Sequence, residues 1–161
     1  MSTGWLLALM YNAVLLSVGG YAWVRGGRPE RIGAAINVVA SFVTGALQLL
    51  DRRYYTPAET IVLGIDVAVV IGFYWLAVST IRFWPVWAFG FALANLIITA
   101  AVLLLPDGSL FAYRSGLNAY AYLALGALAL GTYRVPRSAD DMLRDGSRQT
   151  WIARESQSEN S

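Results

Sequence analysis

Five long apolar runs constrain the fold of this chain more than any short motif does. They cover residues 4–24, 32–50, 60–81, 86–105 and 116–133, the last being shorter and more polar than the others. Each is close to the roughly 20 residues that a helix needs to cross a hydrocarbon core of about 30 Å. The chain is 57% hydrophobic and 14% charged, whereas about a quarter of the residues are charged in typical soluble domains. The sequence therefore predicts an all-α integral membrane bundle of five transmembrane helices.

The arginines predict the orientation of these helices. In a model with five spans, one side carries Arg25, Arg28, Arg31, Arg82, Arg134 and Arg137, and the other carries Arg52, Arg53 and Arg114. Cytoplasmic loops are enriched in basic residues, so we expect the N-terminus outside and the C-terminus in the cytoplasm. Residues 1–133 would then form the five-helix bundle, and residues 134–161 would form a cytoplasmic polar tail.

The tail admits two interpretations. A short interfacial helix at 138–153 would align one weakly apolar face and offer three arginines to lipid phosphates; the face comprises Ala139, Met142, Leu143, Gly146 and Thr150, and the arginines are Arg137, Arg144 and Arg148. A solvated, frayed tail fits the same residues. We expect the residues from Glu155 onward to be disordered.

Missing residue types exclude several kinds of chemistry. The chain has no histidine, cysteine or lysine, so all 12 basic residues are arginine. Ordinary haem, iron–sulfur, zinc and copper sites need imidazole or thiolate ligands. Schiff-base cofactors and the usual serine or cysteine nucleophile pairs are also excluded. We therefore expect no cofactor and no metal. The arginines lie at the ends of apolar runs and form no basic patch, which disfavours nucleic-acid binding.

Polar residues inside the spans form a predicted layer. Asp66 is the one acid within a span, and its layer includes Asn12, Ser41, Thr44, Gln48, Asn95, Thr99 and Tyr122. Counting about 1.5 Å per residue from the outer boundaries places most of these residues at a similar depth. Arg52, Arg53, Glu59 and Arg114 would surround an entrance on the outer side. An acid at that depth is costly unless it faces the bundle interior, so we expect Asp66 to be buried.

The layer has two interpretations that the sequence leaves open. Its groups could join the helices by hydrogen bonds, beside the close-packing pairs Ser41/Gly45, Gly64/Ala68, Gly90/Ala94 and Ala127/Gly131. Alternatively, they could line a cavity in which Asp66 serves as a counter-ion or proton-binding group. Asp66 lies on the side of its helix opposite Gly64 and Ala68, which predicts a central position for the third helix.

A second distinctive segment runs from Arg82 to Trp87. Arg82, Trp84 and Trp87 are typical of an anchor at the membrane interface, and they could equally dock a partner subunit. This segment, together with the Gly26-Gly27-Arg28-Pro29-Glu30-Arg31 loop, resembles small uncharacterised polytopic membrane proteins of alphaproteobacteria. That resemblance implies no particular activity.

These patterns predict an accessory, scaffold or interaction protein without intrinsic catalysis in a bacterial cytoplasmic membrane. Its expected partners are the lipid bilayer and either another membrane protein or a second copy of the chain. The alternative is a small transporter, channel or protein that binds a lipid or small molecule through the Asp66 layer. An enzyme acting on lipid or isoprenoid substrates ranks third, because a second acid–base group is hard to place near Asp66.

Overall fold

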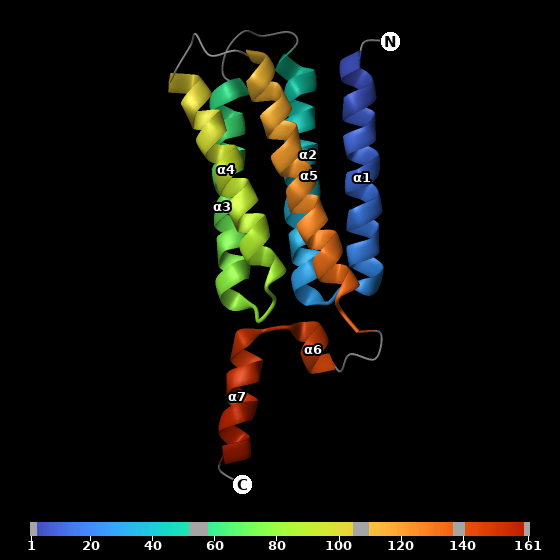
Figure 1. Cartoon of the computed structure of the whole chain (residues 1–161), viewed down its shortest axis with the longest axis vertical. Helices are drawn as coiled ribbons and strands as arrows, with labels where there is room; N and C mark the ends of the chain where they lie inside the picture. The colour runs from blue at the N-terminus through green and yellow to red at the C-terminus, as the bar shows by residue number, and fades with distance from the viewer. Residues whose placement is uncertain (1–2, 52–57, 105–109, 137–140, 160–161) are drawn as a thin grey trace.

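The fold is an up-and-down bundle of long helices with two short helices below it (Figure 1). The computed structural model describes residues 3–51, 58–104, 110–136 and 141–159. The long helices are α1 (Thr3–Arg25), α2 (Arg28–Asp51), α3 (Ala58–Ser79), α4 (Trp84–Leu104) and α5 (Leu110–Tyr133). Each overlaps one apolar run, although α5 begins at Leu110, before the run at 116–133, and the described residues contain no strand.

Three of these helices are long and apolar enough to cross a membrane. Among the described residues, such stretches are Arg28–Leu47 in α2, Ile61–Ser79 in α3 and Trp84–Ala101 in α4. A shorter apolar stretch, Ala119–Tyr133, lies in α5. Large apolar side chains point outward along the bundle, including Leu16 and Phe42, which is 77% exposed. A surface of this kind fits association with a membrane.

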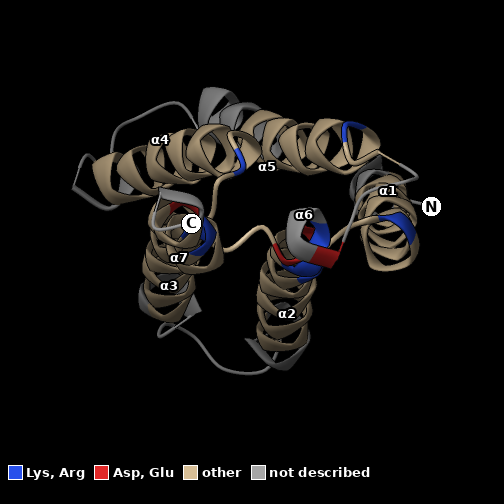
Figure 2. Ribbon diagram, turned by 90° about the horizontal axis from the view of Figure 1, so that it is seen from below, with Lys and Arg blue, Asp and Glu red and all other residues tan. Residues whose placement is uncertain are grey.

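The five long helices are arranged in a ring (Figure 2), in which each helix contacts the next along the chain and α5 contacts α1. α5 packs against α4, α1 and α2, while the main contacts of α3 are with α2 and α4. The predicted central position of the third helix is therefore wrong, and α5 contacts more of the long helices than α3 does. The reason is that Gly64 faces open space and not a neighbouring helix. The buried core lies towards the lower end of the bundle as drawn in Figure 1, around Phe73, Leu76 and Leu128.

The lower end also receives the C-terminal residues (Figure 1). These residues form α6 (Asp141–Asp145) and α7 (Arg148–Glu159). One of the two interpretations of the tail was a single helix at 138–153, of which residues 138–140 lie outside the described part of the chain. The break occurs at Gly146, whose φ of 58° lies in the left-handed region that glycine adopts without steric cost. Helix α7 also runs through Glu155 to Glu159, so the residues expected to be disordered are helical as far as that position.

The turn between α6 and α7 is tied to the bundle. The amide nitrogen of Ile81 donates to the carbonyl oxygen of Gly146 at 3.0 Å. Thr80 and Ser147 form an isolated antiparallel bridge beside this bond. The connection between α3 and α4 therefore holds the C-terminal residues directly beneath the helices.

Candidate functional site

Asp66 is joined to a neighbouring helix by one of its carboxylate oxygens. Thr99 on α4 donates its hydroxyl proton to Asp66 Oδ2 at 3.0 Å. The same hydroxyl lies 3.1 Å from the carbonyl oxygen of Asn95, one turn earlier, so its single proton is shared. Thr99 is only 4% exposed, whereas Asp66 is half-buried. The pair links α3 to α4 at the depth of the predicted polar layer.

A second polar group lies across α1, α2 and α5. The hydroxyls of Tyr11 and Ser41 are 3.2 Å apart and share a hydrogen bond. The ring of Tyr11 packs edge-on against that of Tyr122, with centroids 5.5 Å apart and an interplanar angle of 83°. Tyr11 was absent from the predicted layer. Its position beside Asn12 on an apolar helix was the only available signal.

The remaining residues of the predicted layer are dispersed. Thr44 and Asn95 are half-buried, while the side chain of Asn12 is exposed. Arg52 and Arg53 lie outside the described residues, as do the side chains of Gln48, Glu59 and Arg114. Within the described part, the structure thus divides the layer into an α3–α4 pair and an α1–α2–α5 group.

The most fully buried acid lies elsewhere, at the lower end. Glu30 on α2 is 0% exposed. Its Oε2 accepts a hydrogen bond from the amide of Gly27 at 2.9 Å, which caps the first turn of α2. Its Oε1 accepts one from Trp84 Nε1 at 3.0 Å and lies 3.7 Å from Arg82 Nε. We call Gly27, Glu30, Arg82 and Trp84 the Glu30 cluster.

The Glu30 cluster changes the interpretation of Arg82 and Trp84. Both were expected at an exposed interfacial anchor, but Trp84 is only 6% exposed and Arg82 is largely covered. A Cβ added to Gly33 on α2 or to Gly131 on α5 would collide with the Trp84 indole. Trp84 therefore fills the space between α2 and α5 because glycines leave room for it. Trp87 alone keeps the exposed position expected of an anchor.

Sequence reasoning missed Glu30 as a site residue. A usable signal was present, because Glu30 follows Gly27 by three residues and comes after Pro29, the spacing of a helix N-terminus. That signal locates the cap of α2. It contains nothing about Trp84, which lies 54 positions away in the sequence.

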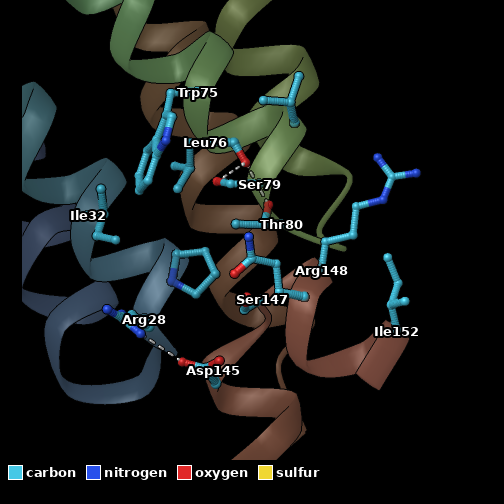
Figure 3. A pocket seen from close by; sticks show the side chains of 13 residues that line it. Arg28, Ile32, Trp75, Leu76, Ser79, Thr80, Asp145, Ser147, Arg148 and Ile152 are labelled. Carbon is cyan, nitrogen blue, oxygen red and sulfur yellow. Dashed lines mark hydrogen bonds and ion pairs between the residues drawn. The ribbon is translucent and has the colours of Figure 1, made fainter. Parts of the chain in front are cut away.

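A cavity adjoins this cluster at the lower end. Its volume is about 430 Å³, and its walls come from α2, α3 and the start of α7 (Figure 3). The lining includes Ile32 of α2 with Trp75 and Leu76 of α3. It also includes two arginines: Figure 3 shows the Arg28 side chain directed to Asp145 and the Arg148 side chain extending away from Ile32 and Trp75. Asp66 does not line it.

Within the described residues, no group of three or more acidic, histidine or cysteine side chains is placed to hold a metal ion.

Comparison with known proteins finds no matching family model, no similar curated protein and no similar solved structure. The resemblance to small polytopic membrane proteins of alphaproteobacteria stays a prediction.

Proposed function

We propose that this chain is an integral membrane scaffold or interaction protein without intrinsic catalysis. The observation that carries this proposal is the hydrogen bond between Thr99 and Asp66. An acid held by a hydroxyl of the adjacent helix serves to join helices, as polar groups in membrane bundles commonly do. The structural use of Glu30 in the cap of α2 supports the same interpretation.

The proposed topology has five spans, with the N-terminus outside and the lower end in the cytoplasm of a bacterium. The arginines at the lower ends of the helices support this orientation; they include Arg25, Arg28, Arg31, Arg82 and Arg134. Figure 2, seen from that end, shows basic residues on several helices. The guanidinium of Arg31 lies 5.9 Å from the ring centroid of Trp23, a cation–π pair suited to the headgroup region. Fusing a periplasm-active reporter after residue 159 tests the topology, and activity of that reporter would contradict it.

Helix α7 is the proposed surface for a protein partner. It projects below the bundle (Figure 1) and carries adjacent exposed residues, Trp151 at 45% and Ile152 at 57%. Aromatic residues with charged neighbours are typical of binding surfaces. The neighbouring charges are Arg148 and Arg154.

In-cell photo-cross-linking tests the interaction role. A photoreactive residue replacing Trp151 should give a discrete protein adduct. The matched control replaces Leu16, an exposed residue in the middle of α1, and should give no such adduct because it would face lipid. Absence of a discrete adduct at Trp151 and at the other exposed positions of α7 would contradict the proposal.

One observation favours a second candidate, a transporter that uses Asp66. The Asp66 side chain is only half-buried, and a partly accessible intramembrane acid can exchange protons or bind cations. Glu30, by contrast, is fully enclosed.

Two variants separate the scaffold from the transporter. Asp66→Asn keeps an oxygen that can accept the Thr99 proton but removes the ionisable group. Thr99→Val removes the hydrogen bond and keeps the acid. For a scaffold, proteoliposomes should show no proton flux, and Thr99→Val should reduce the free energy of unfolding by about 1 kcal/mol, the typical value of such bonds in membranes. Flux in the wild type that Asp66→Asn abolishes would refute the scaffold role.

A further inference from the structure

The turn between α6 and α7 lies directly over the buried ion pair of Glu30 and Arg82. Gly146 in this turn is itself buried, and a Cβ there would lie 3.0 Å from Pro29 Cγ and 3.6 Å from Arg82 Nε. Pro29 immediately precedes Glu30. The backbone at Gly146 therefore closes the lower side of the Glu30 cluster, and we call residues 144–147 the lid.

Backbone contacts join the lid to the connection between α3 and α4. The amide nitrogen of Ile81 donates to the carbonyl oxygen of Gly146 at 3.0 Å, and the bridge between Thr80 and Ser147 lies beside that bond. Arg82 follows Ile81 directly in the sequence. Undocking the lid therefore breaks a hydrogen bond next to Arg82 and removes the atoms that cover the ion pair.

The contacts of the lid with α2 and the residue before it are close but weak. A Cβ at Gly27 would collide with the carbonyl oxygen of Arg144, so the two backbones meet there. Asp145 Oδ1 lies 3.2 Å from Arg28 Nη1 (Figure 3), but these side chains are 29% and 73% exposed. Exposed ion pairs add little to stability because water and salt screen them.

Little apolar burial anchors the C-terminal residues. Among the residues of α6, α7 and their turn whose burial the structure describes, only Gly146 is buried, and residues 148–157 are all exposed. By contrast, Phe73, Leu76 and Leu128 in the core above are each 0% exposed. Segments with few buried apolar contacts open at a lower free energy than the whole molecule does. The lid should therefore open while the long helices stay packed.

We propose that the lid opens and closes independently of the long helices and controls the access of water to the Glu30–Arg82 pair. Opening hydrates both charges, which offsets part of the cost of undocking because a buried ion pair has lost its hydration. Helix α7 begins at Arg148, immediately after the lid, so a molecule bound to α7 is joined to the bundle through the lid. The lid does not depend on the scaffold role, which cross-linking at α7 tests separately.

Hydrogen exchange measured by NMR on the full chain in detergent micelles tests the lid. The amide of Ile81 reports on docking, while the amide of Gly27 and the indole N–H of Trp84, which both bond to Glu30, report on the covered cluster. The amide of Leu128 reports on the core. The three reporters should be less protected from exchange than Leu128. Equal protection would overturn the proposal, because the lid would then open only when the bundle unfolds.

Gly27→Ala should loosen the lid, since its Cβ would displace Arg144. Exchange at Ile81 and at the Trp84 indole should accelerate about tenfold, in keeping with the usual effect of overpacking, and Leu128 should not change. The matched control is Gly20→Ala, whose Cβ meets nothing within 4 Å. No acceleration at Ile81, or an equal acceleration at Leu128, would overturn the proposal.

A disulfide should hold the lid closed. The chain has no cysteine, so Thr80→Cys combined with Ser147→Cys introduces a single thiol pair. Facing residues of an antiparallel bridge have the Cα separation that a disulfide spans. The oxidised protein should exchange the Gly27 amide and the Trp84 indole N–H several-fold more slowly than the same protein after reduction. Failure of the disulfide to form, or identical exchange in the two states, would contradict the lid.

Discussion

Removing the Glu30 carboxylate should destabilise the bundle more than any change at an exposed acid. Glu30→Ala leaves the amide of Gly27 and the indole N–H of Trp84 without their acceptor. Each stranded buried donor costs about 1–3 kcal/mol. Arg82 also loses the carboxylate that lies 3.7 Å from its Nε. Breaking a buried charge pair by removing one partner costs about 3–5 kcal/mol, and we expect a loss in that range.

Equilibrium unfolding in mixed micelles, followed by far-UV circular dichroism, measures this loss. Glu155→Ala on α7 is the matched control, because Glu155 is exposed and surface substitutions usually change stability by less than about 0.5 kcal/mol. Glu30→Gln keeps one acceptor oxygen, so its loss of unfolding free energy should lie between those of Glu30→Ala and Glu155→Ala. Trp84→Phe combined with Glu30→Gln in a double-mutant cycle should show a coupling of at least about 0.5 kcal/mol. A Glu30→Ala loss within about 1 kcal/mol of the control would refute the assigned role of the buried carboxylate.

Two further substitutions test the packing at the same end by the same unfolding assay. Gly131→Ala should cost at least about 1 kcal/mol because its Cβ would collide with the Trp84 indole, whereas Gly126→Ala, whose Cβ meets nothing within 4 Å, should be neutral or slightly stabilising; equal effects would contradict this packing. Gly146→Ala should cost about 1–2 kcal/mol because the backbone there has a φ of 58° and its Cβ would lie 3.0 Å from Pro29 Cγ. Faster limited proteolysis between α5 and α7 should accompany that loss. An unchanged cleavage rate would argue against docking of the α6–α7 turn on the bundle.

The helices of this fold were accessible from the sequence because each apolar run falls largely within one helix, although α5 begins before its run does. The run at 60–81 and helix α3, for example, differ by two residues at each end. Hydrophobicity along the chain decides this property locally. The break at Gly146 was not recovered, because a glycine within a weak amphipathic pattern does not reveal a left-handed backbone.

The contacts between helices were much harder to predict from the sequence than the helices themselves. Gly45, Gly64 and Gly90 were assigned to close-packing pairs, yet a Cβ at any of them would meet nothing within 4 Å. Gly131 was also assigned to such a pair and does make a tight contact, because it receives the ring of Trp84 from another helix. Gly33, which was assigned to no pair, receives the same ring. Spacing along one helix identifies a face but not its neighbour. The sequence pattern placed Asp66 and Thr99 in the same polar layer. It did not predict the hydrogen bond between them, because that bond depends on how α3 packs against α4.

The ion pair between Arg28 and Asp145 also has a consequence for biosynthesis. The two residues are separated by 117 positions. At translation rates of about 5–20 residues per second, Asp145 is synthesised roughly 6–23 s after Arg28. During that interval Arg28, Gly27 and the turn before α4 have no α6–α7 segment to contact. This end of the nascent bundle is therefore uncovered until the segment arrives.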